Sequence, residues 1–388
     1  MPPSVLCLNA GSSSLKFALY EAAANGLRRR MHGAVEKLGT DDVRAWHAME
    51  NAERRQADVD IRDHAEAATW AAQTLHALGM PPPSCVGHRV VHGGTQYAEP
   101  VRLNKEVLAE LHKLVPLAPL HQPPALNVIE AVREAFPDVV HVACFDTAIH
   151  RRMPEIAQRL PLPDRLWNAG VRRYGFHGLS LEYLLDQCAE LRQGRTIILH
   201  LGHGASATAF LDGLPQDTTM GFTPTGGLMM GTRSGDLDPG VLIHLMQEHN
   251  YGPRQINDLV NRESGLRGVS GLSGDMRELE QAAPSNEQAA LAIEMYCWTV
   301  ARHTAALTTS LGGLDRLVFT AGIGEHSSLV RAGVCRRLSF LGIELNDASN
   351  ERSDAIITTN ASPCVVQVLP TDEEAMIAHH ALASLCEG

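Results

Sequence analysis

The stretch that decides the fold is VLCLNAGSSSLKFALY, residues 5–20. It begins with an apolar run and ends with alternating apolar and polar residues, a pattern that predicts two β-strands. The segment between the strands is made of small residues, and such turns leave backbone N–H groups free to bind anions. Lys16 adds a positive charge beside the turn. The stretch therefore predicts either a phosphate-binding hairpin or an ordinary N-terminal hairpin with a polar turn.

A second stretch of the same kind, TIILHLGHGASATAF, occupies residues 196–210. Its residues 200–202 (His-Leu-Gly) align with residues 9–11 (Asn-Ala-Gly) of the first stretch. Two similar strand–turn–strand openings half a chain apart suggest an internal duplication, with coincidence as the alternative for so short a match. We therefore expect two related lobes that each offer an anion-binding hairpin to a shared cleft.

Length and composition limit the classes of function. A chain of 388 residues is too long for one ordinary core, so two domains are expected. The net charge of −11 argues against nucleic acid or an anionic membrane as a partner. No apolar run approaches a membrane span and no signal peptide is recognisable, so we expect a cytoplasmic protein. The 8 scattered cysteines contain no C-x-x-C pair, which favours free thiols over disulfides or zinc.

Several polar residues stand where α/β proteins place ligands. Arg89 lies inside an apolar strand and is costly there unless it is paired or faces a ligand, so it is either functional or part of a structural ion pair. Asp146 follows the apolar run 139–145, and the carboxyl ends of strands are ligand positions, although a cap or turn role is the alternative. Arg233 is the one cation in the glycine-rich segment 220–240, which is typical of a functional loop.

The remaining segments with a clear pattern predict three helices and one glycine turn. Apolar spacing predicts helices over 63–78 and 123–135, and Ser285 with Gln288 predicts a capping box for a helix that ends near 311. Residues 321–326 form a glycine turn before a further helix, a place where a nucleotide can approach the backbone.

With these segments in hand, the chain resembles the acetate and propionate kinase family. The matching segments are, in order, 9–16, 87–94, 117–121, 145–148, 172–178, 200–204, 229–239, 321–325 and 370–378. The resemblance implies an α/β fold, the duplicated ribonuclease-H-like fold of actin, sugar kinases and Hsp70 chaperones, with an interdomain cleft. It places one lobe at residues 1–147, completed by a C-terminal helix at 375–388, and a nucleotide-binding lobe at 148–374. It also implies a homodimer and closure on substrate, with hinges near Thr147 and the start of the last helix.

The resemblance further implies reversible phosphoryl transfer between ATP and acetate, giving acetyl phosphate and ADP with Mg²⁺ or Mn²⁺. The implied catalytic residues are Arg89, Asp146, His177 and Arg233. The implied substrate-binding residues are Arg89, Val91, Leu120, His121, Phe176 and Pro224. The implied phosphate- and nucleotide-binding residues are Ser12, Ser14, Lys16, His200, Leu201, Gly202, His203, Gly204, Asp275, Met276, Arg277, Gly322, Ile323, Gly324, Glu325 and His326. Asn9 and Glu373 are the implied metal ligands.

Three positions depart from the family pattern on the nucleotide side. His203 and His326 stand where the family usually has Asn, and Met276 stands where it often has an aromatic residue. These changes leave open a pyrophosphate- or phosphate-linked acyl kinase. A propionate preference also stays open, because an apolar pocket discriminates one methylene by only ~1–3 kcal/mol. The alternative from another class is a nucleotide-switched binding protein of the actin or Hsp70 kind.

Overall fold

The computed structural model describes residues 2–24 and 26–386. The chain divides into two compact units. The first comprises Met1–Ile149, Gly178–Tyr183 and Asp372–Gly388, and the second comprises His150–His177 and Leu184–Thr371. The first unit thus also contains Gly178–Tyr183, a short segment that the sequence analysis placed in the second lobe.

The first unit is built on an eight-stranded sheet in the order β5-β4-β3-β2-β1-β6-β8-β7. The strands are β1 (Ser4–Ala10), β2 (Ser14–Ala23), β3 (Gly26–Glu36), β4 (Arg44–Met49), β5 (Arg55–Ala57), β6 (Cys85–Val90), β7 (Val101–Arg102) and β8 (Val140–Phe145). β1 and β2 pair antiparallel with Asn9 opposite Lys16, which confirms the predicted hairpin. β6 runs parallel to β1, and β8 runs parallel to β6.

The second unit repeats this pattern in a five-stranded sheet of order β11-β10-β9-β12-β13. Its strands are β9 (Arg195–Leu201), β10 (Ala205–Leu211), β11 (Leu214–Thr218), β12 (Arg316–Thr320) and β13 (Val365–Val368). β9 and β10 form an antiparallel hairpin that β11 extends, while β12 and β13 add parallel strands on the other side of β9. The order β3-β2-β1-β6-β8 has the same directions, so the duplicated ribonuclease-H-like fold is confirmed.

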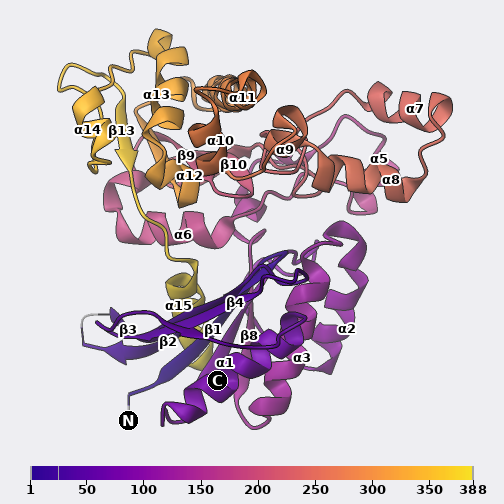
Figure 1. Ribbon diagram of the computed structural model, residues 1–388, viewed down its shortest axis with the longest axis vertical. Helices are drawn as coiled ribbons and strands as arrows, with labels where there is room; N and C mark the ends of the chain where they lie inside the picture. The colour runs from indigo at the N-terminus through magenta and orange to yellow at the C-terminus, as the bar shows by residue number, and fades with distance from the viewer. Residues whose placement is uncertain (1, 25, 387–388) are drawn as a thin grey trace. The chain divides into compact units, whose positions relative to one another are not determined.

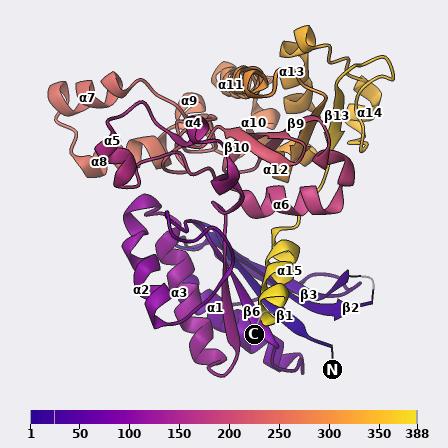
Figure 2. The ribbon, with the colours of Figure 1, turned by 180° about the vertical axis from the view of Figure 1, so that it is seen from behind.

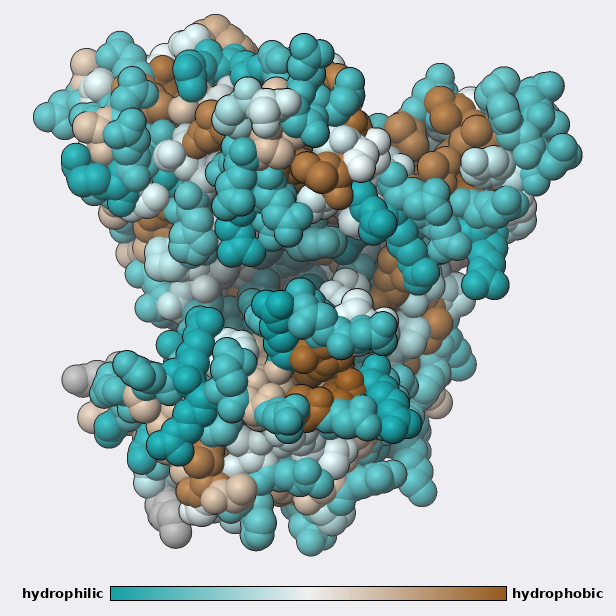
Figure 3. Space-filling model, viewed as in Figure 1, coloured by the Kyte–Doolittle hydropathy of each residue, from teal (hydrophilic) through white to brown (hydrophobic). Residues whose placement is uncertain are grey.

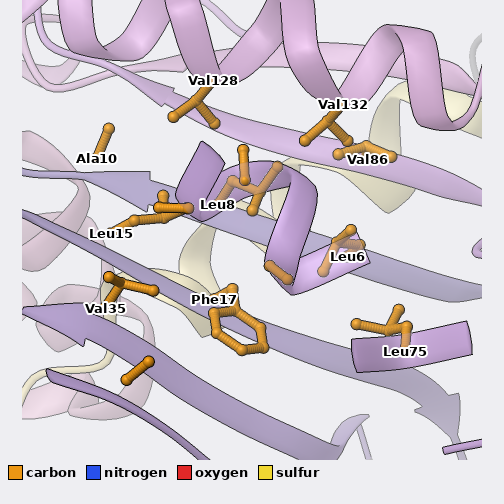
Figure 4. Close-up of a cluster of buried hydrophobic side chains, with 14 of the residues drawn as sticks. Leu6, Leu8, Ala10, Leu15, Phe17, Val35, Leu75, Val86, Val128 and Val132 are labelled. Atoms are coloured by element: carbon orange, nitrogen blue, oxygen red, sulfur yellow. The ribbon is translucent and has the colours of Figure 1, made fainter. Parts of the chain in front are cut away.

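Helices cover both faces of the first sheet (Figures 1 and 2). Side chains of β1 point alternately to the two faces, as the two-residue period of a strand requires. Leu6 and Leu8 pack with α1 (His64–Ala77) and α3 (Gln122–Ala135) in the cluster of Figure 4. Val5 and Cys7 pack on the opposite face against α15 (Glu373–Cys386). The C-terminal helix therefore completes the core of the N-terminal unit.

The remaining helices are α2 (Lys105–Lys113), α4 (Glu155–Gln158), α5 (Asp164–Asn168), α6 (Gly178–Gln187), α7 (Pro239–Glu248), α8 (Pro253–Asp258), α9 (Gly265–Ser270), α10 (Met276–Ala282), α11 (Glu287–Leu311), α12 (Ala321–His326), α13 (Ser328–Arg337) and α14 (Asp347–Glu351). Of these, α2 belongs to the first unit, α6 is divided between the two units, and the others belong to the second. Among the described residues, none of these helices has both the length and the apolar character to cross a membrane.

Two expectations about helix starts were wrong. α11 is capped by Asn286, whose Oδ1 accepts hydrogen bonds from the backbone N–H groups of Gln288 and Ala289, and not by a capping box from Ser285. Asn is as good a cap as Ser, and the position directly before the helix decides which side chain reaches the free N–H groups. The segment expected as a glycine turn is itself helix α12, which follows β12 directly.

Two buried histidines couple the stability of the first unit to pH. His88 Nε2 lies 2.9 Å from Nδ1 of His141, whose Nε2 lies 3.1 Å from the Phe136 carbonyl oxygen. Burial, and then the neighbouring His141, hold the pKa of His88 well below its usual value, and burial lowers the pKa of His92 to about 3. The rings of His88 and His92 therefore stay neutral in the folded state at pH values at which the same two histidines take up a proton in the unfolded chain.

We therefore expect the free energy of unfolding to fall as the pH falls below about 6.5, by ~1.4 kcal/mol per pH unit for each such histidine. His88→Leu removes one titrating group and should flatten this slope by one proton. Urea unfolding followed by Trp46 and Trp70 fluorescence, in a chain whose Trp167 and Trp298 are Phe, measures the first unit alone. Equal slopes for His88→Leu and the parent chain would contradict the expectation.

Candidate active site

The carboxyl ends of β1, β6 and β8 bring polar side chains together in the first unit. Because these strands are parallel neighbours, their carboxyl ends share one edge of the sheet, where α/β folds place ligands. Arg89 Nε and Nη2 donate to Asp146 Oδ2 at 2.8 and 2.6 Å. Arg89 Nη1 donates to Asn9 Oδ1 at 3.2 Å and to the Ala10 carbonyl at 3.3 Å. Arg89 is therefore paired with Asp146, and this ion pair lies at the edge of the sheet where α/β folds place ligands.

Two carboxylates from the start of α15 join this edge. The Asn9 side-chain amide donates to Glu373 Oε2 at 2.8 Å and to Glu374 Oε1 at 2.7 Å. Arg89 Nε lies 4.0 Å from Glu373 Oε2. Burial raises the pKa of Glu374, while Glu374 in turn raises the pKa of Lys16. The cluster thus carries more carboxylates than cations.

The charge imbalance bears on whether a metal ion fits here. Burial, opposed by Arg89 and reinforced by Glu373, raises the pKa of Asp146 to about 6. Asp146 Oδ1 is buried and has no hydrogen-bond partner among the described residues. Among the described residues, no three or more His, Cys, Asp or Glu side chains are grouped so that they could hold a metal ion. Mg²⁺ usually binds through one or two carboxylates while water and phosphate fill its other positions, so this partial oxygen set fits it.

A second cluster forms in the second unit around Gly204. A Cβ atom at Gly204 would lie 3.1 Å from His177 Nε2 and 3.7 Å from Arg233 Nη1, so both nitrogens lie close to the same side of this glycine. The His177 ring stacks on His200 with centroids 4.1 Å apart. Arg233 is only 7% exposed and donates from Nη1 to the Pro224 carbonyl at 2.8 Å. An anion above Gly204 would meet an imidazole and a guanidinium together.

His177 reaches this position through an unusual backbone. It precedes α6 with φ 61° and ψ 26°, in the left-handed region. A non-glycine residue there is uncommon, and such residues concentrate at functional sites. Its Nδ1 lies 2.9 Å from the Ser206 hydroxyl, so the ring is held on one edge and one face.

A cavity of about 390 Å³ lies in the second unit. Eight of the thirteen predicted phosphate- and nucleotide-binding residues of the second unit line it, namely Gly202, His203, Asp275, Met276, Arg277, Gly322, Ile323 and His326. Burial, and then Arg233, lower the pKa of His203. The cavity combines apolar side chains that suit a flat base with donors that suit phosphate.

Other predicted nucleotide-binding residues lie outside the cavity lining. These are His200, Leu201, Gly204, Gly324 and Glu325. The Glu325 carboxylate accepts from the backbone N–H groups of Ala321 at 2.8 Å and Thr371 at 3.3 Å, so its contacts are with the chain itself.

Gly274, Glu280 and Ser327 also line the cavity and were not predicted from the sequence. Glu280 lies four residues after Met276 on α10, so helical spacing was the available signal. Ser327 caps α13 by accepting from the Val330 N–H at 3.0 Å, and its hydroxyl donates to Glu280. The hydrogen bond from Ser327 thereby fixes the Glu280 side chain in the cavity lining.

The predicted substrate-binding residues are divided between the units. Val91, Leu120 and His121 belong to the first, and Phe176 and Pro224 to the second. Ser12 stands in the β1–β2 turn and Ser14 begins β2, and the Gly11 N–H donates to the Ser14 carbonyl at 2.8 Å. Each unit by itself thus holds part of the predicted set.

Comparison with known proteins gives consistent matches along the chain. The chain matches the model of the Acetokinase family over residues 4–379. An acetate kinase of Methylocella silvestris is 44% identical over 403 aligned positions, which cover 99% of this chain and 98% of that protein. A crystal structure of Porphyromonas gingivalis acetate kinase has a TM-score of 0.87 at 39% identity, covering 99% of this chain and 100% of that one. A propionate kinase from Francisella tularensis subsp. tularensis SCHU S4 has a TM-score of 0.91 at 33% identity, covering 98% and 99%.

Proposed function

Because the chain belongs to the acetokinase family, we infer that it is an acetate kinase, a phosphotransferase with a carboxyl group as acceptor. It transfers a phosphoryl group reversibly between ATP and acetate, giving acetyl phosphate and ADP. The observation that carries the proposal is the approach of His177 Nε2 and Arg233 Nη1 to the same side of Gly204, where a Cβ atom would lie 3.1 and 3.7 Å from them. Those two groups suit the charge of a phosphoryl group, and the neighbouring cavity suits the nucleotide that delivers it.

Phosphoryl transfer depends mainly on in-line positioning and charge neutralisation. Acetate is already ionised at neutral pH, so the reaction needs no strong general base. We propose that Arg233 and His177 donate to the equatorial oxygens of the phosphoryl group as it moves. We propose that Arg89, oriented by Asp146, binds the acetate carboxylate. On this proposal the clusters of the two units act on one pair of substrates.

We propose that Asn9 and Glu373 hold Mg²⁺, with Mn²⁺ as a substitute, and that Asp146 orients the metal or the carboxylate. The surplus of carboxylates around Asn9 and the unpartnered Asp146 Oδ1 support this assignment. When bound, the metal neutralises charge on the nucleotide phosphates. Lys16, Ser12 and Ser14 would line the phosphate path, with His121 as a further donor.

The lining of the 390 Å³ cavity supports ATP rather than pyrophosphate as the phosphoryl donor. Met276, which is 3% exposed, and Ile323 line the 390 Å³ cavity and provide an apolar surface that pyrophosphate would not need. Val91, Leu120, Phe176 and Pro224 are the proposed pocket for the acyl methyl group. Propionate remains an alternative substrate, because such a pocket separates one methylene by only ~1–3 kcal/mol.

An acyl hydroxamate assay tests the function. The purified protein is incubated with Mg²⁺, hydroxylamine, one carboxylate and one phosphoryl donor, with acetate or propionate crossed against ATP or pyrophosphate. We expect hydroxamate with acetate and ATP, and a smaller yield with propionate. Hydroxamate that forms with pyrophosphate but not with ATP would overturn the nucleotide assignment. The absence of hydroxamate with every pair of carboxylate and phosphoryl donor would overturn the kinase function.

Lobe closure is the dynamic part of the proposal. We expect the lobes to close on substrate about hinges near Thr147 and the start of α15, which excludes water from the reaction. Small-angle scattering should show a smaller radius of gyration with acetate, ADP and Mg²⁺ than with buffer alone. Identical scattering curves would contradict closure.

We also propose that the protein is a cytoplasmic homodimer. Support comes from α7, where exposed apolar side chains include Val241, Ile243 and Met246, at 43, 53 and 48%. No residue of this ten-residue helix is buried, and Figure 3 shows hydrophobic residues gathered over the segment labelled α7 in Figure 1. A helix with so much uncovered apolar surface is typical of a segment that packs on a partner.

Placing charge on this helix should therefore separate the protomers. We expect Ile243→Glu with Met246→Glu to convert the dimer to a monomer, because an interface core excludes unpaired charge. Sedimentation equilibrium gives the mass, and Ile156→Glu, at a residue 88% exposed in the same unit, is the matched control. A double variant that stays dimeric would exclude α7 from the interface.

A further inference from the structure

Ser206 lies beside the proposed catalytic histidine, and the function assigned above gives it no role. It belongs to β10, directly opposite His200 of β9 in the antiparallel register. Its side chain is fully buried, and its hydroxyl lies 2.9 Å from His177 Nδ1. Within residues 2–24 and 26–386, this ring nitrogen is the one hydrogen-bond partner of the hydroxyl.

The hydrogen-bond inventory decides which atom donates. A serine hydroxyl carries one hydrogen, and a neutral imidazole carries one hydrogen on either Nδ1 or Nε2. If Nδ1 were protonated, it would donate to Ser206 and leave the buried hydroxyl hydrogen without an acceptor. Buried polar hydrogens are nearly always satisfied, so the hydroxyl donates to Nδ1 and the ring proton stands on Nε2.

The protonated nitrogen is the one that lies on the Gly204 side of the ring, next to Arg233. Nε2 is the atom 3.1 Å from the Cβ position at Gly204, beside Arg233 Nη1 at 3.7 Å. The stacked His200 ring and the left-handed backbone at His177 fix the plane of the imidazole, whereas the tautomer depends on the Nδ1 contact. With the other tautomer, a lone pair on Nε2 would face the lone pairs of any oxyanion above Gly204.

We propose that Ser206 is a positioning residue that holds His177 in its Nε2-protonated tautomer, so that the ring donates to a phosphoryl oxygen. The donation to phosphoryl rests on the proposed kinase function, while the tautomer does not. Ser206 contacts no substrate in this scheme and acts only through the imidazole.

The test compares Ser206→Ala, Ser206→Thr and a control, Thr208→Val. Thr208 lies two residues further on the same face of β10, is fully buried, and its hydroxyl lies 3.3 Å from His150 Nε2. The control therefore also removes a buried hydroxyl beside a histidine, without touching His177. Long-range ¹H–¹⁵N correlation spectra of ¹⁵N-histidine-labelled protein, without substrates, report which ring nitrogen of His177 carries the proton.

We expect Nε2 to be protonated in the parent chain and in Ser206→Thr, and the two tautomers to mix in Ser206→Ala. The alanine variant should lose about 10- to 100-fold in kcat with little change in KM for acetate, the size of loss seen when the partner that orients a metal-ligating histidine is removed. Ser206→Thr should restore most of the turnover, and Thr208→Val should keep the parent kcat.

Two results would overturn the proposal. One is an unchanged tautomer in Ser206→Ala, and the other is an equal loss of kcat in Ser206→Ala and Thr208→Val, which would indicate a folding effect. A parent chain that makes no acetyl phosphate but shows the expected spectra would overturn the kinase function and support the Ser206–His177 assignment.

Discussion

Replacing Arg233 by alanine is expected to lower kcat by about three orders of magnitude while the second unit keeps its fold. The guanidinium lies beside Gly204 and His177 and is held there by the Pro224 carbonyl, so on the proposed mechanism it is already in place when the phosphoryl group arrives. A fixed charge of this kind stabilises the transition state without reorganisation at the moment of reaction. Its loss should therefore appear in kcat more than in the KM for acetate.

Steady-state hydroxamate kinetics measure the effect, and two variants sharpen it. Arg233→Lys keeps the charge but loses the planar fork, so it should recover only part of the turnover. Arg262→Ala removes an exposed arginine of the same unit and should retain the parent kcat. Turnover within a factor of about two of the parent in Arg233→Ala would remove Arg233 from the transition-state contacts.

The two hairpins were predictable because their signals are local. Apolar runs flank the turn residues at 9–14 and 202–204 and specify one hairpin in each unit, whereas the full duplicated strand order was an implication of the family resemblance. Arg89 and Asp146 were recognisable one at a time, because a charge inside or directly after an apolar strand is costly without a partner. Their contact with each other links residues 57 positions apart, so strand pairing had to be known first.

Other features of the site depend on tertiary contacts that no local pattern carries. The Ser206 hydroxyl meets His177 across 29 positions of sequence, and nothing around either residue indicates the other. Glu280 shares a face of α10 with Met276, which is a local signal, but the Ser327 hydroxyl that holds its carboxylate comes from 47 positions away. The choice of Asn286 over Ser285 as the helix cap was a local error, since both residues are good caps and one position separates them.

Asp146→Leu is expected to lower the free energy of unfolding of the first unit by about 3–5 kcal/mol. Asp146 is fully buried, and the Arg89 side chain is 11% exposed, so the variant leaves a guanidinium in a poorly solvated place. The contacts that remain are Asn9 Oδ1, the Ala10 carbonyl and Glu373 at 4.0 Å, which replace one short ion pair only in part. Urea unfolding followed by Trp46 and Trp70 fluorescence measures the loss, and a cost below about 1 kcal/mol would contradict it.

The double variant Arg89→Met with Asp146→Leu separates the two roles weighed for Arg89. Each single change strands one buried charge, whereas the pair together can be replaced by apolar side chains of similar size at little cost in stability. We therefore expect the double variant to be more stable than Asp146→Leu alone, with the coupling read from the double-mutant cycle. If the ion pair served the fold alone, turnover would return together with stability. We expect stability to return and turnover to stay absent, because the proposed carboxylate site needs the guanidinium itself.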